Sequence, residues 1–236
     1  MIIIPARLGS TRFPKKILAK IGKYPMVVAT AKRVESVDDV IVATDSEEVK
    51  QICAQYGVRA ELTSVHHQSG TDRINEVVQS LGIDDNELVI NVQADEPFIE
   101  PEILKELITK LKNLQKQKRD FIMASCAKSI SKDEAKDPNL VKVILDKNND
   151  AIYFSRSIIP YDRDSLYNKY LGHIGIYGFD AKSLNKFCSM QGTLEHIEKL
   201  EQLRVLENAQ KIAIIEVKTK SFGIDTLADL QKALLL

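Results

Sequence analysis

The chain has few cysteines, no excess charge of either sign and no long apolar run. Its three cysteines, Cys53, Cys126 and Cys188, are widely spaced and form no CxxC motif, so neither a disulfide framework nor a zinc site is indicated. Lys and Arg number 33, as do Asp and Glu, so no net positive charge exists to attract nucleic acid or an anionic membrane. No apolar run approaches the length of about 18 residues that a membrane-spanning helix needs.

Other sequence signals are missing as well. The apolar run at Met1 has no basic segment before it and no small-residue cleavage site after it, which argues against a signal peptide. The chain also contains no internal repeat, low-complexity stretch or linker. Hydrophobic residues make up 44% and charged residues 28% of the 236 residues, which is the balance of an ordinary globular protein. We therefore expect a soluble, cytoplasmic protein with one domain spanning residues 1–236.

The first half alternates short apolar runs with helical patterns. Buried strands are predicted at Ile2–Pro5, Val40–Thr44 and Leu88–Val92, and a shorter strand at Arg59–Thr63. Helices are predicted at Pro25–Val34, at Glu47–Tyr56 with Ser46 as its N-cap, at Thr71–Leu81 and at Pro101–Lys118. Strands that alternate with helices at this spacing indicate an α/β fold, with a mainly parallel sheet and helices on both faces.

The second half has a different pattern. Two β-rich runs, Val141–Leu145 and Ala151–Phe154, flank a polar turn and predict a β-hairpin. Further predicted elements are a strand at Leu171–Phe179, a helix at Glu195–Glu207 with Ile197 on its apolar side, a strand at Ile212–Val217 and a closing helix at Leu227–Leu236. The hairpin is expected to be an elaboration of the single α/β domain.

A basic segment follows the first predicted strand. It reads PARLGSTRFPKK and carries Arg7, Arg12, Lys15 and Lys16 among small residues. Backbone amides of a small-residue loop together with cations are what a triphosphate requires, although a solvated loop has the same composition. The segment is neither a Walker loop nor a GxGxxG motif. Because open parallel sheets bind ligands at the carboxyl ends of their strands, phosphate binding is the favoured interpretation.

Carboxylates follow other strands. Asp95 and Glu96 come directly after the fourth predicted strand, where a carboxylate can hold Mg²⁺ or complement a helix N-terminus. Asp45 ends the second strand, and Asp225 offers a carboxylate that could instead cap the final helix. His66 and His67 are adjacent but have no third zinc ligand nearby in the sequence, so loop packing is favoured over a role in shaping the site.

Seven segments together resemble a known family. They are PARLGSTRFPKKIL, HHQSGTDR, NVQADEP, YFSRSIIPYDR, HIGIYGF, LEHIEKLEQLR and GIDT, and they occur in the order of the 3-deoxy-manno-octulosonate (Kdo) cytidylyltransferases. The resemblance implies a Rossmann-like nucleotide-diphospho-sugar transferase fold. Residues 1–130 and 210–236 would form the nucleotide-binding core, and residues 131–209 the part that binds the sugar acid and makes a homodimer contact. It also implies Mg²⁺-dependent transfer of CMP from CTP to Kdo, for lipopolysaccharide biosynthesis.

The resemblance also implies site residues. Triphosphate ligands would be Arg7 and Lys16, with Arg12 nearby, and magnesium ligands would be Asp95 and Asp225. The cytosine-reading turn would comprise Gln68, Ser69, Gly70, Thr71 and Arg73. The sugar-acid pocket would comprise Gln93, Arg156, His173, Tyr177, Glu201 and Gln202. Three positions depart from the family pattern: Lys15 and Ala94 replace glycines, and Tyr161 replaces a common tryptophan.

Several alternatives compete with this interpretation. A cytidylyltransferase for another sugar acid, such as sialic acid, would share the fold and chemistry. A nucleotide-binding module without turnover would not need Arg7, Lys16, Asp95 and Asp225 together. A glycosyltransferase would need a DxD-type motif, which QADEP does not supply. Without the resemblance, His173 and Tyr177 would be read as core residues, and Glu201 and Gln202 as a solvated helix face.

Overall fold

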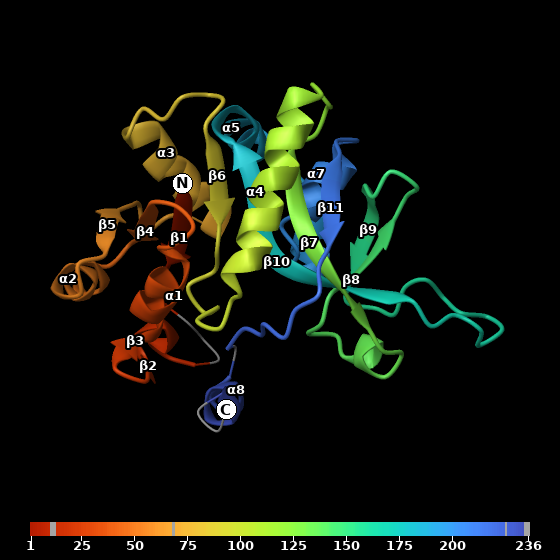
Figure 1. Cartoon of the computed structure of the whole chain (residues 1–236), viewed down its shortest axis with the longest axis horizontal. Helices are drawn as coiled ribbons and strands as arrows, with labels where there is room; N and C mark the ends of the chain where they lie inside the picture. The colour runs from red at the N-terminus through yellow and green to blue at the C-terminus, as the bar shows by residue number, and fades with distance from the viewer. Residues whose placement is uncertain (10–12, 68, 225, 234–236) are drawn as a thin grey trace. The chain divides into compact units, whose positions relative to one another are not determined.

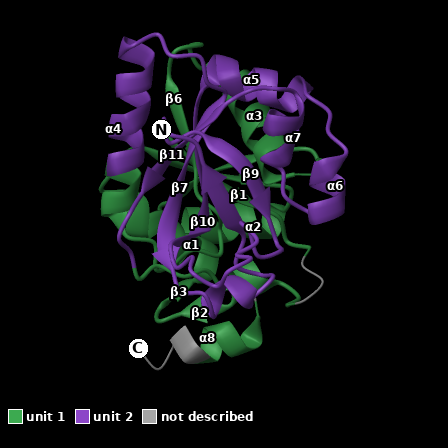
Figure 2. Cartoon of the chain, turned by 90° about the vertical axis from the view of Figure 1, so that its right-hand side faces the viewer, with its two compact units in different colours: residues 1–105, 220–236 green, residues 106–219 purple. Residues whose placement is uncertain are grey.

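The computed structural model describes residues 1–9, 13–67, 69–224 and 226–233. These residues form two compact units, one of residues 1–105 with 220–236 and one of residues 106–219 (Figure 2). Helix α4 (Pro101–Lys116) begins in the first unit and continues into the second. Among the helices of the described residues, none has the length and apolar composition to cross a membrane.

The first unit contains a parallel sheet (Figure 1). Its strands are β1 (Ile2–Ala6), β4 (Val40–Thr44), β5 (Arg59–Leu62) and β6 (Leu88–Asn91). They pair in the order β5–β4–β1–β6, and Ile2 of β1 is in register with Val40 on one side and Ile90 on the other. β1 is buried along its whole length, as expected for an inner strand of a sheet covered on both faces.

Three helices of the first unit connect these strands: α1 (Met26–Val34), α2 (Glu47–Gln55) and α3 (Gly70–Ser80). The closing helix α8 (Leu227–Ala233) belongs to the same unit. The predicted N-cap of α2 is confirmed, because the Ser46 side chain accepts a hydrogen bond from the Val49 amide. The loop after β1 also contains a short 3₁₀ helix at Lys16–Leu18 and a small hairpin, β2 (Lys20–Ile21) with β3 (Tyr24–Pro25). This hairpin was not predicted, since each of its strands has only two residues.

The second unit contains a mixed sheet. Its strands are β7 (Met123–Ile130), β8 (Lys142–Leu145), β9 (Ala151–Ser155), β10 (Tyr170–Asp180) and β11 (Ile212–Glu216). β7 pairs in parallel with β11 and antiparallel with β10, and β8 pairs antiparallel with β10 and β9. The predicted hairpin is therefore confirmed as β8–β9. Its helices are α5 (Ala181–Ser189), α6 (Leu194–Glu198) and α7 (Leu203–Glu207), with a 3₁₀ turn at Glu134–Lys136.

The prediction of one helix at Glu195–Glu207 is wrong. The chain breaks after α6 because Lys199 has a left-handed backbone, with a φ of 55°. The Arg156 side chain donates hydrogen bonds to the carbonyls of Glu198 and Lys199, at 2.7 and 3.4 Å, and so satisfies acceptors at the end of the shortened helix. Ile197, expected on the apolar side, is instead 71% exposed.

Two elements of the second unit were missed. β7 has the sequence MASCAKSI, in which small residues give little strand signal, although its first five side chains are buried. α5 is a short helix directly after β10, and Asp180 caps it by accepting a hydrogen bond from the Ser183 amide at 2.7 Å. The small buried residues explain why β7 was missed, whereas α5 has a buried apolar face, with Leu184 and Phe187, that was overlooked in the sequence.

Candidate functional site

A pocket of about 190 Å³ lies at the carboxyl edge of the parallel sheet in the first unit. Pro5, at the end of β1, and Gln93, after β6, contribute to its wall together with the start of α3. Its lining residues are Pro5, Arg7, His67, Ser69, Gly70, Arg73 and Gln93. The structure thus brings five of the sequence-selected site residues to one pocket, at the edge where open parallel sheets bind ligands.

The start of α3 fits closely against β1 at this pocket. Ser69 caps the helix by accepting a hydrogen bond from the Asp72 amide at 3.1 Å, and its hydroxyl donates to the Asp72 carboxylate at 2.8 Å. A Cβ at Gly70 would lie 3.0 Å from Cγ of Pro5, so glycine permits this close approach. Thr71 is fully buried and accepts a hydrogen bond from Asn91 at 3.3 Å, which links the start of α3 to the end of β6.

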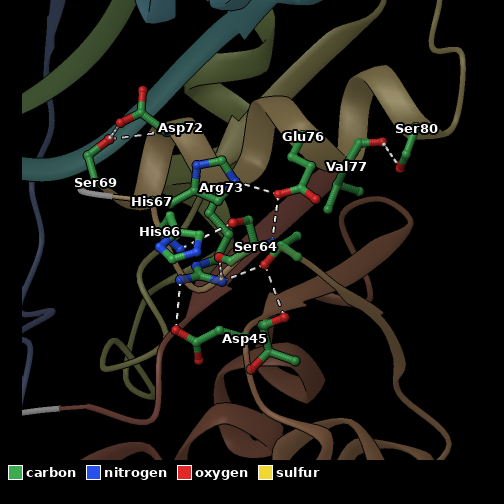
Figure 3. A network of polar contacts seen from close by, with 12 residues as sticks. Asp45, Ser64, His66, His67, Ser69, Asp72, Arg73, Glu76, Val77 and Ser80 are labelled. Atoms are coloured by element: carbon green, nitrogen blue, oxygen red, sulfur yellow. Dashed lines mark hydrogen bonds and ion pairs between the residues drawn. The ribbon is translucent and has the colours of Figure 1, made fainter.

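Arg73 is buried in the wall of the pocket with only 3% of its side chain exposed. Its guanidinium donates to the Asp45 carboxylate at 2.8 Å, to the Ser64 carbonyl at 3.3 Å and to the Thr63 hydroxyl. Asp45, at the end of β4, also accepts a hydrogen bond from the Leu8 amide at 3.3 Å. Figure 3 shows Arg73 between Asp45 and the segment that follows β5. This ion pair, which the sequence did not reveal, links β4, α3 and the loop after β1.

His67 lies at the same pocket and is paired with Glu76 of α3. The Glu76 carboxylate also accepts a hydrogen bond from the Ser64 amide at 2.9 Å (Figure 3). Burial alone would raise the pKa of Glu76, but the hydrogen bonds from Ser64 and His67 and the nearby Arg73 charge hold that pKa below its ordinary value. Glu76 is therefore ionised at neutral pH. Sequence reasoning missed Glu76, although its position three residues after Arg73 on a helix was a usable signal.

The two adjacent lysines of the basic loop have different partners. Lys16 is 11% exposed, and its Nζ lies 2.5 Å from Oδ2 of Asp95. Lys15 is 60% exposed and pairs with Glu48 at 3.0 Å. The φ of Lys15 is 51°, in the left-handed region that favours glycine, which is the residue expected there from the family pattern. Only Lys16 of the two therefore lies beside the carboxylate that follows β6.

A segment distant in the sequence joins Asp95 within the first unit. The Ile224 amide donates a hydrogen bond to the Asp95 carbonyl at 2.9 Å. The predicted carboxylate at the next position, Asp225, lies outside the described residues, as do Arg12 and Gln68. Ile224 thus lies beside Asp95, the first of the two predicted magnesium ligands.

A second group of sequence-selected residues meets in the second unit. His173 of β10 contacts the Ser125 hydroxyl at 2.8 Å and the Gln202 amide at 3.5 Å, and the Tyr177 hydroxyl donates to Gln202 at 3.1 Å. Burial raises the pKa of Tyr177 well above its ordinary value, and the charge of nearby Glu201 adds to this effect. Burial lowers the pKa of His173 to about 3, so the imidazole is neutral at physiological pH.

The geometry of β10 permits this grouping. Its pairing with β7 shifts register between Ile174 and Tyr177, and the Ser125 hydroxyl donates to the Ile176 carbonyl at 2.8 Å within that irregularity. Such bulges often occur beside functional sites, where they redirect side chains. Ser125 was missed because β7 itself was missed.

Arg156 is held at the end of β9 in the same unit. Besides the carbonyls of Glu198 and Lys199, its guanidinium donates to the Pro138 carbonyl at 3.0 Å. Its backbone amide donates to the Glu198 carboxylate at 2.9 Å, and its carbonyl accepts from the fully buried Lys142 at 2.6 Å. The guanidinium thus has neutral acceptors, so its positive charge is available to an anionic ligand.

Comparisons with known proteins agree with this arrangement. A family model described as cytidylyltransferase matches residues 1–212. A 3-deoxy-manno-octulosonate cytidylyltransferase from Wolinella succinogenes is 50% identical over 99% of this chain and 98% of its own, and one from Nitratiruptor is 51% identical over 98% and 97%.

A solved structure supports the fold as well as the family. It is a CMP:2-keto-3-deoxy-manno-octonic acid synthetase complexed with CTP, 36% identical, with a TM-score of 0.90 over 99% of this chain and 96% of that one. These matches confirm the resemblance drawn from the seven sequence segments. The chain belongs to the cytidylyltransferase family, among the 3-deoxy-manno-octulosonate cytidylyltransferases.

Proposed function

We propose that this protein transfers CMP from CTP to Kdo, giving CMP-Kdo and pyrophosphate for lipopolysaccharide synthesis. The observation that carries the proposal is the pairing of Lys16 with Asp95 after β6, in the unit whose pocket is lined by Arg7, Arg73 and Gln93. Cations and a carboxylate at the carboxyl edge of a parallel sheet suit a triphosphate. Because the chain belongs to the cytidylyltransferase family, we infer that the reaction at this site is cytidylyl transfer.

In the proposed reaction, the anomeric hydroxyl oxygen of Kdo attacks the α-phosphorus of CTP. A new phosphorus–oxygen bond forms there, and the hydroxyl proton passes to water. The bond from the α-phosphorus to the oxygen that bridges to the β-phosphate breaks, so pyrophosphate leaves. Such transfers depend mainly on positioning and on stabilising charge. Arg7 and Lys16 would supply positive charge to the phosphoryl oxygens without a covalent nucleophile.

The residues around Asp95 fit a magnesium ion. Lys16 already places a cation against its carboxylate, and Mg²⁺ is commonly held by one or two carboxylates together with phosphate oxygens. Asp95, with Asp225, would hold the metal, and Lys16 would then be released toward the triphosphate. When bound, the ion would stabilise phosphoryl charge and lower the pKa of the sugar hydroxyl.

The second unit would bind the sugar acid. Because burial lowers the pKa of His173 to about 3, this side chain cannot supply a positive charge to the Kdo carboxylate. Its neutral ring, with Tyr177, Gln202 and Glu201, suits hydrogen bonding to sugar hydroxyls, as would Gln93. We therefore assign the carboxylate to Arg156, whose guanidinium has only neutral acceptors among the described residues.

CTP is expected to be preferred over UTP. Cytosine presents an amino donor and an acceptor nitrogen where uracil presents an oxygen and an N–H, and the turn leading into α3, including Ser69 and Gly70, would read this difference. A site built to hydrogen-bond one base leaves polar groups unpaired with the other, so we expect at least about 100-fold higher kcat/KM for CTP. Equal kcat/KM values in parallel assays would contradict this assignment.

The protein is expected to be a homodimer. Four large apolar side chains of the segment between β9 and β10 are exposed: Ile158, Tyr161, Leu166 and Tyr167. Exposed apolar groups concentrated in one segment are typical of an interaction surface. Sedimentation equilibrium at micromolar concentration should give about twice the chain mass of 26.5 kDa. A mass of one chain would contradict the dimer.

Pyrophosphate release tests the function directly. The protein is incubated with CTP and Mg²⁺ in the presence of Kdo, of sialic acid or of neither. Release is expected with Kdo only. Release with sialic acid alone would identify the related sugar-acid enzyme, and no release with either acid would identify a nucleotide-binding module without turnover.

A further inference from the structure

Helix α3 carries two opposite charges, one turn apart, that face the segment after β5 (Figure 3). Arg73 donates a hydrogen bond to the carbonyl of Ser64, and Glu76 accepts one from the amide of the same residue. Both backbone polar groups of Ser64 are therefore held by side chains of a single helix. The position of this segment thus depends on α3.

The segment ends at His67, which lines the pocket of the first unit. The same Glu76 oxygen, Oε2, contacts both the Ser64 amide and Nε2 of His67. Glu76 is 39% exposed and is not among the described residues that line the pocket. One carboxylate oxygen outside the pocket thus fixes both the backbone leading to His67 and its imidazole ring.

We propose that Glu76 is a positioning residue for the nucleotide: it fixes His67 as a wall of the pocket and thereby sets the affinity for CTP. The inference rests on the proposed function, because it identifies this pocket as the CTP site. Without the Glu76 carboxylate, the His67 ring would be free to move in the unbound protein. It would lose that freedom when CTP binds, and this loss of entropy lowers the affinity for CTP. The Kdo side of the reaction should be little affected. Gln93, the one proposed sugar residue that lines this pocket, donates to Asn91 and not to Glu76, and His173, Tyr177 and Gln202 belong to a separate network.

Two substitutions at Glu76 separate its two contacts. Glu76→Ala removes both, and we expect KM for CTP to rise about 10-fold, the lower limit for a hydrogen bond to a charged group. Glu76→Gln keeps an oxygen for the Ser64 amide but loses the charge that holds His67, so a rise of roughly threefold is expected. For both variants, kcat and KM for Kdo should stay within about twofold of the wild type.

A double-mutant cycle then tests whether Glu76 acts through His67. Glu76→Gln is combined with His67→Ala, and CTP binding is measured by calorimetry as well as by KM. In the His67→Ala background, Glu76→Gln should have no further effect on CTP affinity. Gln79→Ala is the matched control, because Gln79 is exposed on the same helix, and it should bind CTP as the wild type does.

The outcomes distinguish this inference from the proposed function. If the wild type releases no pyrophosphate from CTP and Kdo, the proposed function fails. If the wild type is active but both Glu76 variants keep its KM for CTP, the positioning role is wrong. It is also wrong if Glu76→Gln weakens CTP binding equally with and without His67, because Glu76 would then act on the fold alone. Should Glu76→Ala not fold, the Gln variant and the cycle still decide.

Discussion

Replacing Asp95 by asparagine is expected to lower turnover by about 100- to 1000-fold, the loss typical of removing a preorganised charge stabiliser. Asp95 lies in the loop that follows β6, four residues after its last residue Asn91, and its carboxylate is paired with Lys16. Asparagine keeps the shape of the side chain but cannot offer a charged oxygen to a cation. Steady-state pyrophosphate release at saturating CTP and Kdo, with Mg²⁺, measures the loss.

Asp85→Asn provides the matched control for this substitution. Asp85 is exposed in the same unit, so the same chemical change there should leave activity unaltered. The circular dichroism and Tm of the Asp95 variant show whether it is folded. A folded Asp95→Asn protein that retains more than about a tenth of wild-type turnover would show that Asp95 is not a metal ligand.

Substitutions of Arg156 should act mainly on Kdo. The reacting hydroxyl of Kdo can be aimed only if the neighbouring carboxylate is held, and a guanidinium offers a planar fork of donors that lysine lacks. Arg156→Ala should therefore be the worst variant and Arg156→Lys clearly impaired. Loss of one charge-assisted contact is expected to lower kcat/KM for Kdo by about 10- to 150-fold, with KM for CTP nearly unchanged.

The structure adds a second expectation for Arg156. Its donors also satisfy carbonyls of Pro138, Glu198 and Lys199, so Arg156→Ala should lower the free energy of unfolding by about 1 kcal/mol. Arg163→Lys is the control, because Arg163 is exposed in the loop after β9. If Arg156→Lys matches the wild type in kcat/KM for Kdo, or if the defect falls on CTP, Arg156 serves only to cap the end of α6.

Strands β1, β4 and β6 of the first unit could be predicted because they are buried along nearly their whole length, whereas β5 has no buried residue. Ile2–Ile4 and Val40–Thr44 are short continuous apolar runs, which are typical of buried strands. Both are strands of the parallel sheet. The break at Lys199 could not be predicted, since the donor that satisfies the freed carbonyls is Arg156, more than forty residues earlier in the chain. Contacts of this range leave no periodic signal.

The candidate site, like the fold, could be predicted only in part from the sequence. Arg7, Lys16 and Asp95 occur in short motifs after strands, so the sequence identified them as candidates. The pairing of Arg73 with Asp45 and of His67 with Glu76 depends on how α3 lies against the sheet, which only the structure shows. The motifs therefore predicted the charged residues that could bind a ligand, and the structure added Asp45 and Glu76, which hold Arg73 and His67 at the pocket.

Transfer of label from the α-phosphate of CTP tests the central claim most directly. The protein is incubated with α-³²P-labelled CTP, Mg²⁺ and Kdo, and the products are separated and their masses measured. The account predicts that the label joins the sugar acid in a one-to-one CMP adduct, matched by the pyrophosphate released. Label that stays in CTP, or that is recovered only as free CMP, would contradict the claim that this chain is a cytidylyltransferase acting on Kdo.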